Sequence, residues 1–133
     1  MARDLKCEMQ GGVLVARVSG DFALDQSCNT FLEILKAMDI YKADKVLVDC
    51  LQVRGAPSTM ERFSYAKFGS DELWKLLLAK NLEEVQLAYV GTDPLMDKDH
   101  FGQTVATNRG VNVKTFDNVA AAISWLGTHS KGK

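Results

Sequence analysis

The 133 residues carry 16 lysines and arginines against 17 acidic residues, so the formal net charge is −1, which excludes a nucleic-acid binder that depends on a basic surface. Hydrophobic residues make up 47% of the chain and charged residues 25%, an ordinary composition for a soluble globular protein. No apolar run approaches the roughly 18 residues of a membrane span, so the sequence also excludes a transmembrane protein.

The length fits one domain over residues 1–133, with a flexible tail from about residue 128 to 133. The first residues lack the apolar core of a secretory signal. The three cysteines, Cys7, Cys28 and Cys50, are odd in number and far apart, which suits reduced thiols better than a disulfide framework. We therefore expect a cytoplasmic protein.

The first elements expected along the chain are two strands, Cys7–Gln10 and Val13–Val18. Gly11 and Gly12 between them indicate a two-residue hairpin turn. Apolar side chains at spacings of three and four then predict a helix, with Asp25 as its cap and with an apolar face of Cys28, Phe31, Leu32, Leu35 and Met38.

Residues 45–61 are the most informative segment. The run 45–51 is apolar with β-branched members, which is typical of a strand covered on both faces. Pro57 bars further strand pairing, and Ser58 with Glu61 three residues later fits a capping box at the start of a helix. In open α/β sheets, ligands and partners bind where a strand's carboxyl end meets such a helix.

The second half of the chain alternates helix and strand. The helix that begins at Ser58 is expected to break or kink at Gly69-Ser70, with a second piece starting at Asp71. Further elements are a strand over 85–90, a helix over 98–108 stopped by Asn108-Arg109-Gly110, a strand over 111–116, and a last helix capped by Asp117 and ended by Gly127.

The resulting order, β-β-α-β-α-β-α-β-α, predicts an α/β fold. Its sheet should have four or five strands, mixed but mostly parallel, with helices packed mainly on one face.

This order resembles the STAS family (sulfate transporter and anti-sigma-factor antagonist domains), and more closely its SpoIIAA-like, or STAS/SEC14-like, branch of small stand-alone bacterial domains. The resemblance runs from about Leu5 to Leu126 and rests on residues 15–22, 46–49, 88–91, and 113–117 leading to 121–126. It implies a SpoIIAA-like fold and a non-enzymatic, regulatory protein–protein interaction module.

In anti-sigma-factor antagonists, a partner kinase phosphorylates a serine of an Asp-Ser-Ser-Gly motif at the start of the helix after the third strand. Phosphate there adds roughly −2 charge to the docking surface. This chain has residues 54–59, Arg-Gly-Ala-Pro-Ser-Thr, in that place. Ser58 and Thr59 are therefore the regulatory candidates, and the alternative is a helix cap worth about 1 kcal/mol.

Two loops at strand ends are candidates for binding a small anion or ligand, through Asp49, Gly55, Gly91 and Asp93. An enzyme acting at the Asp49 and Asp93 loops is a further alternative. The sequence has no dinucleotide or phosphate loop and no pairing of a nucleophile with a base. His100 beside Asp97 and Asp99 fits a solvated first helical turn. We therefore expect no enzyme, no cofactor and no metal.

A helix that lies on a sheet needs only one apolar stripe to face that sheet, and Trp74 and Leu78 lie outside this stripe. Phe63 and Phe68 lie upstream of them in the same predicted helix. Three interpretations stay open for this predicted apolar surface. The chain's own elements cover it, a protein partner or second copy docks on it in a homodimer, or it forms a groove for a lipid or other apolar molecule, as in a SEC14/CRAL-TRIO-like carrier.

Overall fold

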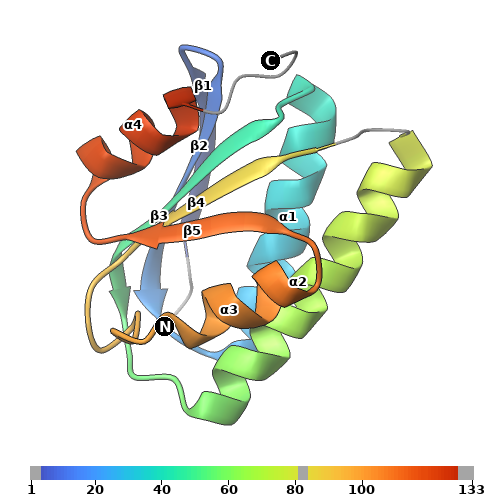
Figure 1. The fold of residues 1–133 in the computed structure, drawn as a ribbon. Helices are drawn as coiled ribbons and strands as arrows, with labels where there is room; N and C mark the ends of the chain where they lie inside the picture. Colours follow the sequence, from blue (N-terminus) through green and yellow to red (C-terminus); the bar gives the residue numbers. More distant parts are fainter. Residues whose placement is uncertain (1–3, 81–83, 129–133) are drawn as a thin grey trace.

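A five-stranded sheet in the order β1-β2-β3-β4-β5 forms the centre of the computed structural model, which describes residues 4–80 and 84–128 (Figure 1). β1 runs antiparallel to β2, and the other three pairs are parallel. The mixed, mostly parallel sheet is confirmed. Its strands are β1 (Asp4–Gln10), β2 (Val13–Asp21), β3 (Lys45–Arg54), β4 (Gln86–Val90) and β5 (Asn112–Phe116).

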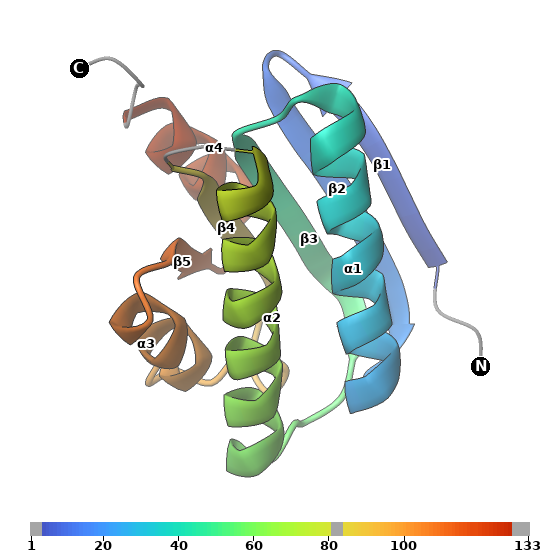
Figure 2. The same cartoon turned by 90° about the vertical axis from the view of Figure 1, so that its right-hand side faces the viewer.

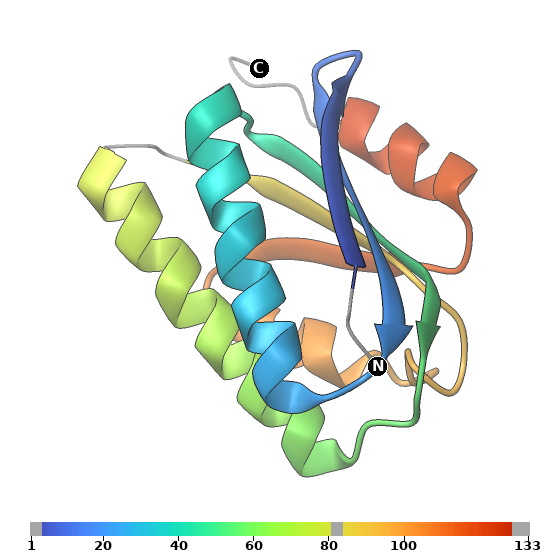
Figure 3. The same cartoon turned by 180° about the vertical axis from the view of Figure 1, so that it is seen from behind.

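Three of the four described helices cover one face of this sheet (Figure 2). They are α1 (Leu24–Tyr41), α2 (Thr59–Lys80) and α3 (Phe101–Asn108). Each connects two neighbouring parallel strands, and right-handed crossovers between successive strands place such helices on the same side. α4 (Val119–Thr128) follows the last strand and packs on the opposite face, visible from behind in Figure 3. The prediction that the helices pack mainly on one face of the sheet is thus confirmed.

β3 contributes to the cores on both faces. Val46 and Val48 pack under α1 and α2, and Leu47 between them packs under α4. Alternate side chains of a strand point to opposite faces, so a run without polar residues is buried on both sides.

β3 is longer than predicted because it contains a bulge. Arg17 pairs with Asp49, but Ser19 pairs with Gln52, so two residues of β3 oppose one of β2. The Leu51 amide at the bulge donates to Asp49 Oδ1 at 3.0 Å. The extra residue returns Val53 to the same core as Val48.

The hairpin at Gly11 and Gly12 is confirmed. Both residues have positive φ, 57° and 85°, which is the conformation that a two-residue turn with matching strand twist demands. The stop at the end of α3 is also confirmed, since Gly110 has φ 85° and its amide donates to the Thr107 carbonyl at 3.0 Å.

The predicted break at Gly69-Ser70 is wrong, because α2 is one continuous helix from Thr59 to Lys80. Gly69 is buried where α2 lies close to α1, and a Cβ there would be 3.4 Å from the Phe31 ring. The glycine therefore serves close packing between the helices.

Four helix ends differ from the sequence-based expectation. Asp25 lies inside the first turn of α1, which begins after Ala23. Asn118 rather than Asp117 caps α4, since its Oδ1 accepts the Ala121 amide at 2.8 Å. Gly127 lies inside α4, and α3 begins only at Phe101. Apart from Thr128, the expected tail is outside the described residues.

Candidate functional site

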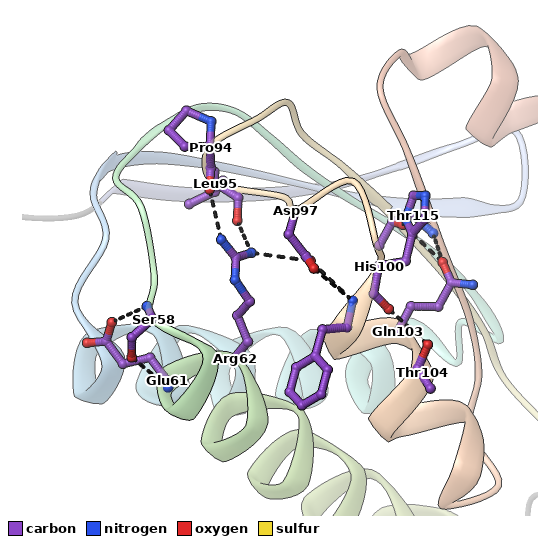
Figure 4. Close-up of polar contacts among 11 residues, drawn as sticks. Ser58, Glu61, Arg62, Pro94, Leu95, Asp97, His100, Gln103, Thr104 and Thr115 are labelled. Carbon is purple, nitrogen blue, oxygen red and sulfur yellow. Dashed lines mark hydrogen bonds and ion pairs between the residues drawn. The ribbon is translucent and has the colours of Figure 1, made fainter.

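The loops that follow β3 and β4 come together where α2 begins, at the carboxyl edge of the parallel strands (Figure 4). The predicted capping box is confirmed there. The Ser58 amide donates to Glu61 Oε1 at 2.8 Å, and the Glu61 amide donates to Ser58 Oγ at 3.1 Å. Ser58, Thr59 and Met60 are exposed, so this helix start faces solvent.

Arg62 joins the first turn of α2 to the connection between β4 and α3. Its guanidinium donates to the Leu95 carbonyl at 2.7 Å and to the Pro94 carbonyl at 2.9 Å, and lies 3.5 Å from Asp97 Oδ1 (Figure 4). Its side chain is only 15% exposed. The planar fork of arginine suits several oxygens at once. This role of Arg62 could not be predicted from the sequence, because its partners lie more than 30 positions away.

The start of α3 is fixed in turn by Asp97 and by β5. Both Asp97 carboxylate oxygens accept the Phe101 amide at 3.2 Å. His100, with φ 55°, shares a hydrogen bond through Nδ1 with the Thr115 hydroxyl, and Gln103 Oε1 accepts the Thr115 amide at 2.8 Å. Across residues 4–80 and 84–128, no group of three or more His, Cys, Asp or Glu is placed to hold a metal ion.

Three of the four predicted anion-loop residues have local structural contacts. The Gly91 amide donates to the Phe116 carbonyl at 2.9 Å, and the Asp49 carboxylate accepts the Leu51 amide. Gly55 has φ 145° and faces Phe22, whose Cβ would lie 2.8 Å from an added Cβ. Asp93 is exposed before the cis bond to Pro94. The Gly91 amide therefore points to the neighbouring strand rather than to a bound anion.

One residue of the predicted apolar surface lies apart from the others on α2. At about 100° per residue, Phe63, Trp74 and Leu78 fall within about 60° of one another, whereas Phe68 lies about 140° from Phe63. Trp74 lies against α3, where its indole donates to the Arg109 carbonyl at 2.9 Å and its ring abuts Gly110. Leu78 is 76% exposed. Trp74 is therefore covered by α3 of the same chain, which is the first of the three interpretations.

None of the three cysteines forms a disulfide, and all three are partly buried. Burial, followed by the Glu33 carboxylate, raises the pKa of Cys7, and burial, followed by the Asp25 carboxylate, raises the pKa of Cys28. A raised pKa leaves less thiolate at neutral pH, so neither has the character of a nucleophile.

A pair of tyrosines lies between α2 and the sheet. The hydroxyls of Tyr65 and Tyr89 are 2.8 Å apart, and the rings meet edge to face at 6.3 Å. Burial first, and Tyr65 next, raise the pKa of Tyr89 well above its ordinary value. This pair also went unnoticed in the sequence, because the two residues are on separate elements.

Comparisons of the sequence with protein-family models and with curated proteins find no match. Solved structures do match. An anti-sigma factor antagonist from Mycobacterium paratuberculosis aligns with a TM-score of 0.59 at 13% identity, covering 95% of each chain. An uncharacterized protein with a SpoIIAA-like fold from Shewanella loihica aligns with a TM-score of 0.51 at 17% identity, covering 93% of each chain. The expected SpoIIAA-like fold is therefore confirmed.

No helix within the described ranges is long and apolar enough to cross a membrane.

Proposed function

We propose that this chain is a regulatory domain that binds a protein partner through the carboxyl edge of its sheet. The proposed partner surface consists of residues 58–60 at the start of α2 and residues 92–94 after β4, all of them exposed. A structural neighbour is an anti-sigma factor antagonist. The domain would act by binding, and its partner is another protein or a second copy of this chain.

The observation that carries this proposal is the set of hydrogen bonds that Arg62 makes to the connection between β4 and α3. These bonds to the Leu95 and Pro94 carbonyls tie the two exposed segments together in the free domain. A surface that is already ordered loses less conformational freedom on binding, which favours affinity. The surface is also close to neutral in charge, so contact with a protein fits better than contact with a polyanion.

If phosphorylation regulates this surface, Thr59 is a better site for the phosphate than Ser58. A phosphate on Ser58 would disrupt the hydrogen bond from the Glu61 amide and lie near the Glu61 carboxylate. Thr59 is exposed in the first turn of α2, where the helix dipole stabilises a negative charge. A phosphate there would change the charge of the partner surface without disturbing the cap.

Met60→Asp tests the partner surface, with Leu78→Asp as its matched control. Both side chains are exposed, 70% and 76%, and both lie on the outer line of α2 because 18 residues make five full turns. We expect Met60→Asp to weaken partner binding at least tenfold and Leu78→Asp to leave it unchanged. The measurement is affinity purification from native extract with each variant, followed by calorimetric titration of any purified partner that Met60→Asp loses.

Self-association is tested in parallel by sedimentation of the wild type and both variants over a range of concentrations. A dimer that dissociates only in Met60→Asp would make the partner a second copy. Equal binding by both variants, to every partner retained and to itself, would show that this surface does not carry the interaction.

A further inference from the structure

A cavity of about 160 Å³ that is partly open to solvent lies between the sheet and the helices α1, α2 and α3. Its wall is mostly apolar and includes Phe31, Val48, Leu73, Leu87, Ala106 and Val113. Small residues leave this space, since Ala66 and Gly69 of α2 and Ala106 of α3 all line it. The layer of helices therefore does not fill the volume above the sheet.

Ser70 lines this cavity from the middle of α2 and is only 3% exposed. Its Oγ is buried and has no hydrogen-bond partner among the described residues. A serine in a helix ordinarily satisfies its hydroxyl with the carbonyl four residues back or with water. A buried hydroxyl without a partner is costly, and such a group calls for a partner that the chain does not supply.

The charges at the cavity wall are already engaged within the chain. Arg62 pairs with Asp97, and Glu61 accepts the Ser58 amide. A charged occupant would meet no free opposite charge among these groups and would have to lose its hydration. The wall thus suits a neutral occupant.

The size of the cavity sets the size of its occupant. An engineered protein cavity of about 150 Å³ remains dry and binds benzene, and a buried water needs two to four polar partners. Most of the wall is apolar, and among the described residues Ser70 Oγ is the only fully buried side-chain oxygen or nitrogen without a partner, which favours an organic molecule over water. We propose that this cavity binds a neutral, ring-sized apolar molecule that carries one hydroxyl or carbonyl oxygen, with Ser70 Oγ as its hydrogen-bond partner once the serine side chain turns toward the occupant.

The test compares 4-methylphenol with toluene, which is the same ring without the hydroxyl. Binding is followed by titration of the methyl resonances of Val48, Leu73, Leu87 and Val113 in the wild type and in Ser70→Ala. We expect the wild type to bind 4-methylphenol about fivefold to tenfold more tightly than toluene. In Ser70→Ala we expect this preference to disappear while toluene binding remains.

Two further variants keep the test decisive. Ala106→Leu fills the cavity from α3 and should abolish binding of both probes, while Leu78→Asp, at an exposed position away from the cavity, should leave it unchanged. Circular dichroism checks the fold of each variant. Absence of methyl shifts in the wild type, unchanged shifts in a folded Ala106→Leu, or a crystal soaked with 4-methylphenol that shows only an ordered water on Ser70 Oγ would overturn the proposal.

Discussion

Tyr89 shows at the scale of one residue how burial changes chemistry. Its hydroxyl meets that of Tyr65 at 2.8 Å beneath α2, and burial disfavours the charged phenolate. The pKa of Tyr89 is therefore higher in the folded protein than in the unfolded chain, where it is about 10. The folded state binds this proton more tightly, so its contribution to stability is complete below about pH 10 and is lost as the pH rises through the folded pKa.

Tyr89→Phe should remove this part of the pH dependence. We expect the wild type to lose more unfolding free energy between pH 9 and pH 11 than the variant does, because only the wild type must ionise or expose this phenol. Urea unfolding at several pH values measures the difference. Tyr41→Phe is the control, since Tyr41 is 48% exposed. Equal losses in wild type and Tyr89→Phe would contradict the prediction.

Ser58 at the start of α2, and Arg62 and Ser70 within it, are three kinds of polar residue. Ser58 forms its bonds within three residues, so its role as a cap could be predicted from sequence spacing. Arg62 bonds to Pro94 and Leu95, and Ser70 has no partner in the described chain. The surroundings of Arg62 and Ser70 depend on segments that are distant in sequence. The spacing of residues within α2 therefore does not predict the roles of these two side chains.

At the scale of elements, the contact between α2 and α3 depends on Trp74. Its indole donates to the Arg109 carbonyl at the end of α3, and its ring packs against Gly110. The same contact holds the partly buried Trp74 against the core, while Leu78 one turn later remains in solvent. The two side chains lie one turn apart on the helix, and of the two only Trp74 is covered at the end of α3.

Trp74→Ala should destabilise the fold by about 2–4 kcal/mol, because it removes a large apolar ring and leaves the Arg109 carbonyl without its donor. Leu78→Ala should change stability by less than about 0.5 kcal/mol. Urea unfolding followed by circular dichroism compares the two. A small effect of Trp74→Ala would place its ring outside the core, as the sequence alone had led us to consider.

At the scale of the whole molecule, two cores share one sheet. Val46 and Val48 of β3 belong to the core under α1, α2 and α3, and Leu47 belongs to the core under α4. Neither layer can lose the strand without exposing the other, so we expect cooperative unfolding. The two tryptophans report on the two layers, since Trp74 packs against the first core and Trp125 against the second, beside Phe116.

Single-tryptophan variants test this cooperativity. Trp125→Phe leaves Trp74 as the fluorescent probe of the α2 layer, and Trp74→Phe leaves Trp125 as the probe of the α4 layer. Within each variant, the fluorescence transition in urea should coincide with the transition followed by circular dichroism. Loss of the Trp125 signal at a clearly lower urea concentration would show that α4 unfolds separately.

The amino-acid sequence by itself determined the strands, the hairpin at Gly11-Gly12 and the capping box at Ser58, because these depend on residues within a few positions of one another. The parallel order also followed, since helical crossovers leave few alternatives. Only the tertiary structure decided that α2 passes unbroken through Gly69, that Trp74 is covered by α3, and that Arg62 joins two loops. Each depends on contacts between elements tens of residues apart, and the cavity beside Ser70 exists only because three helices and a sheet meet around small side chains.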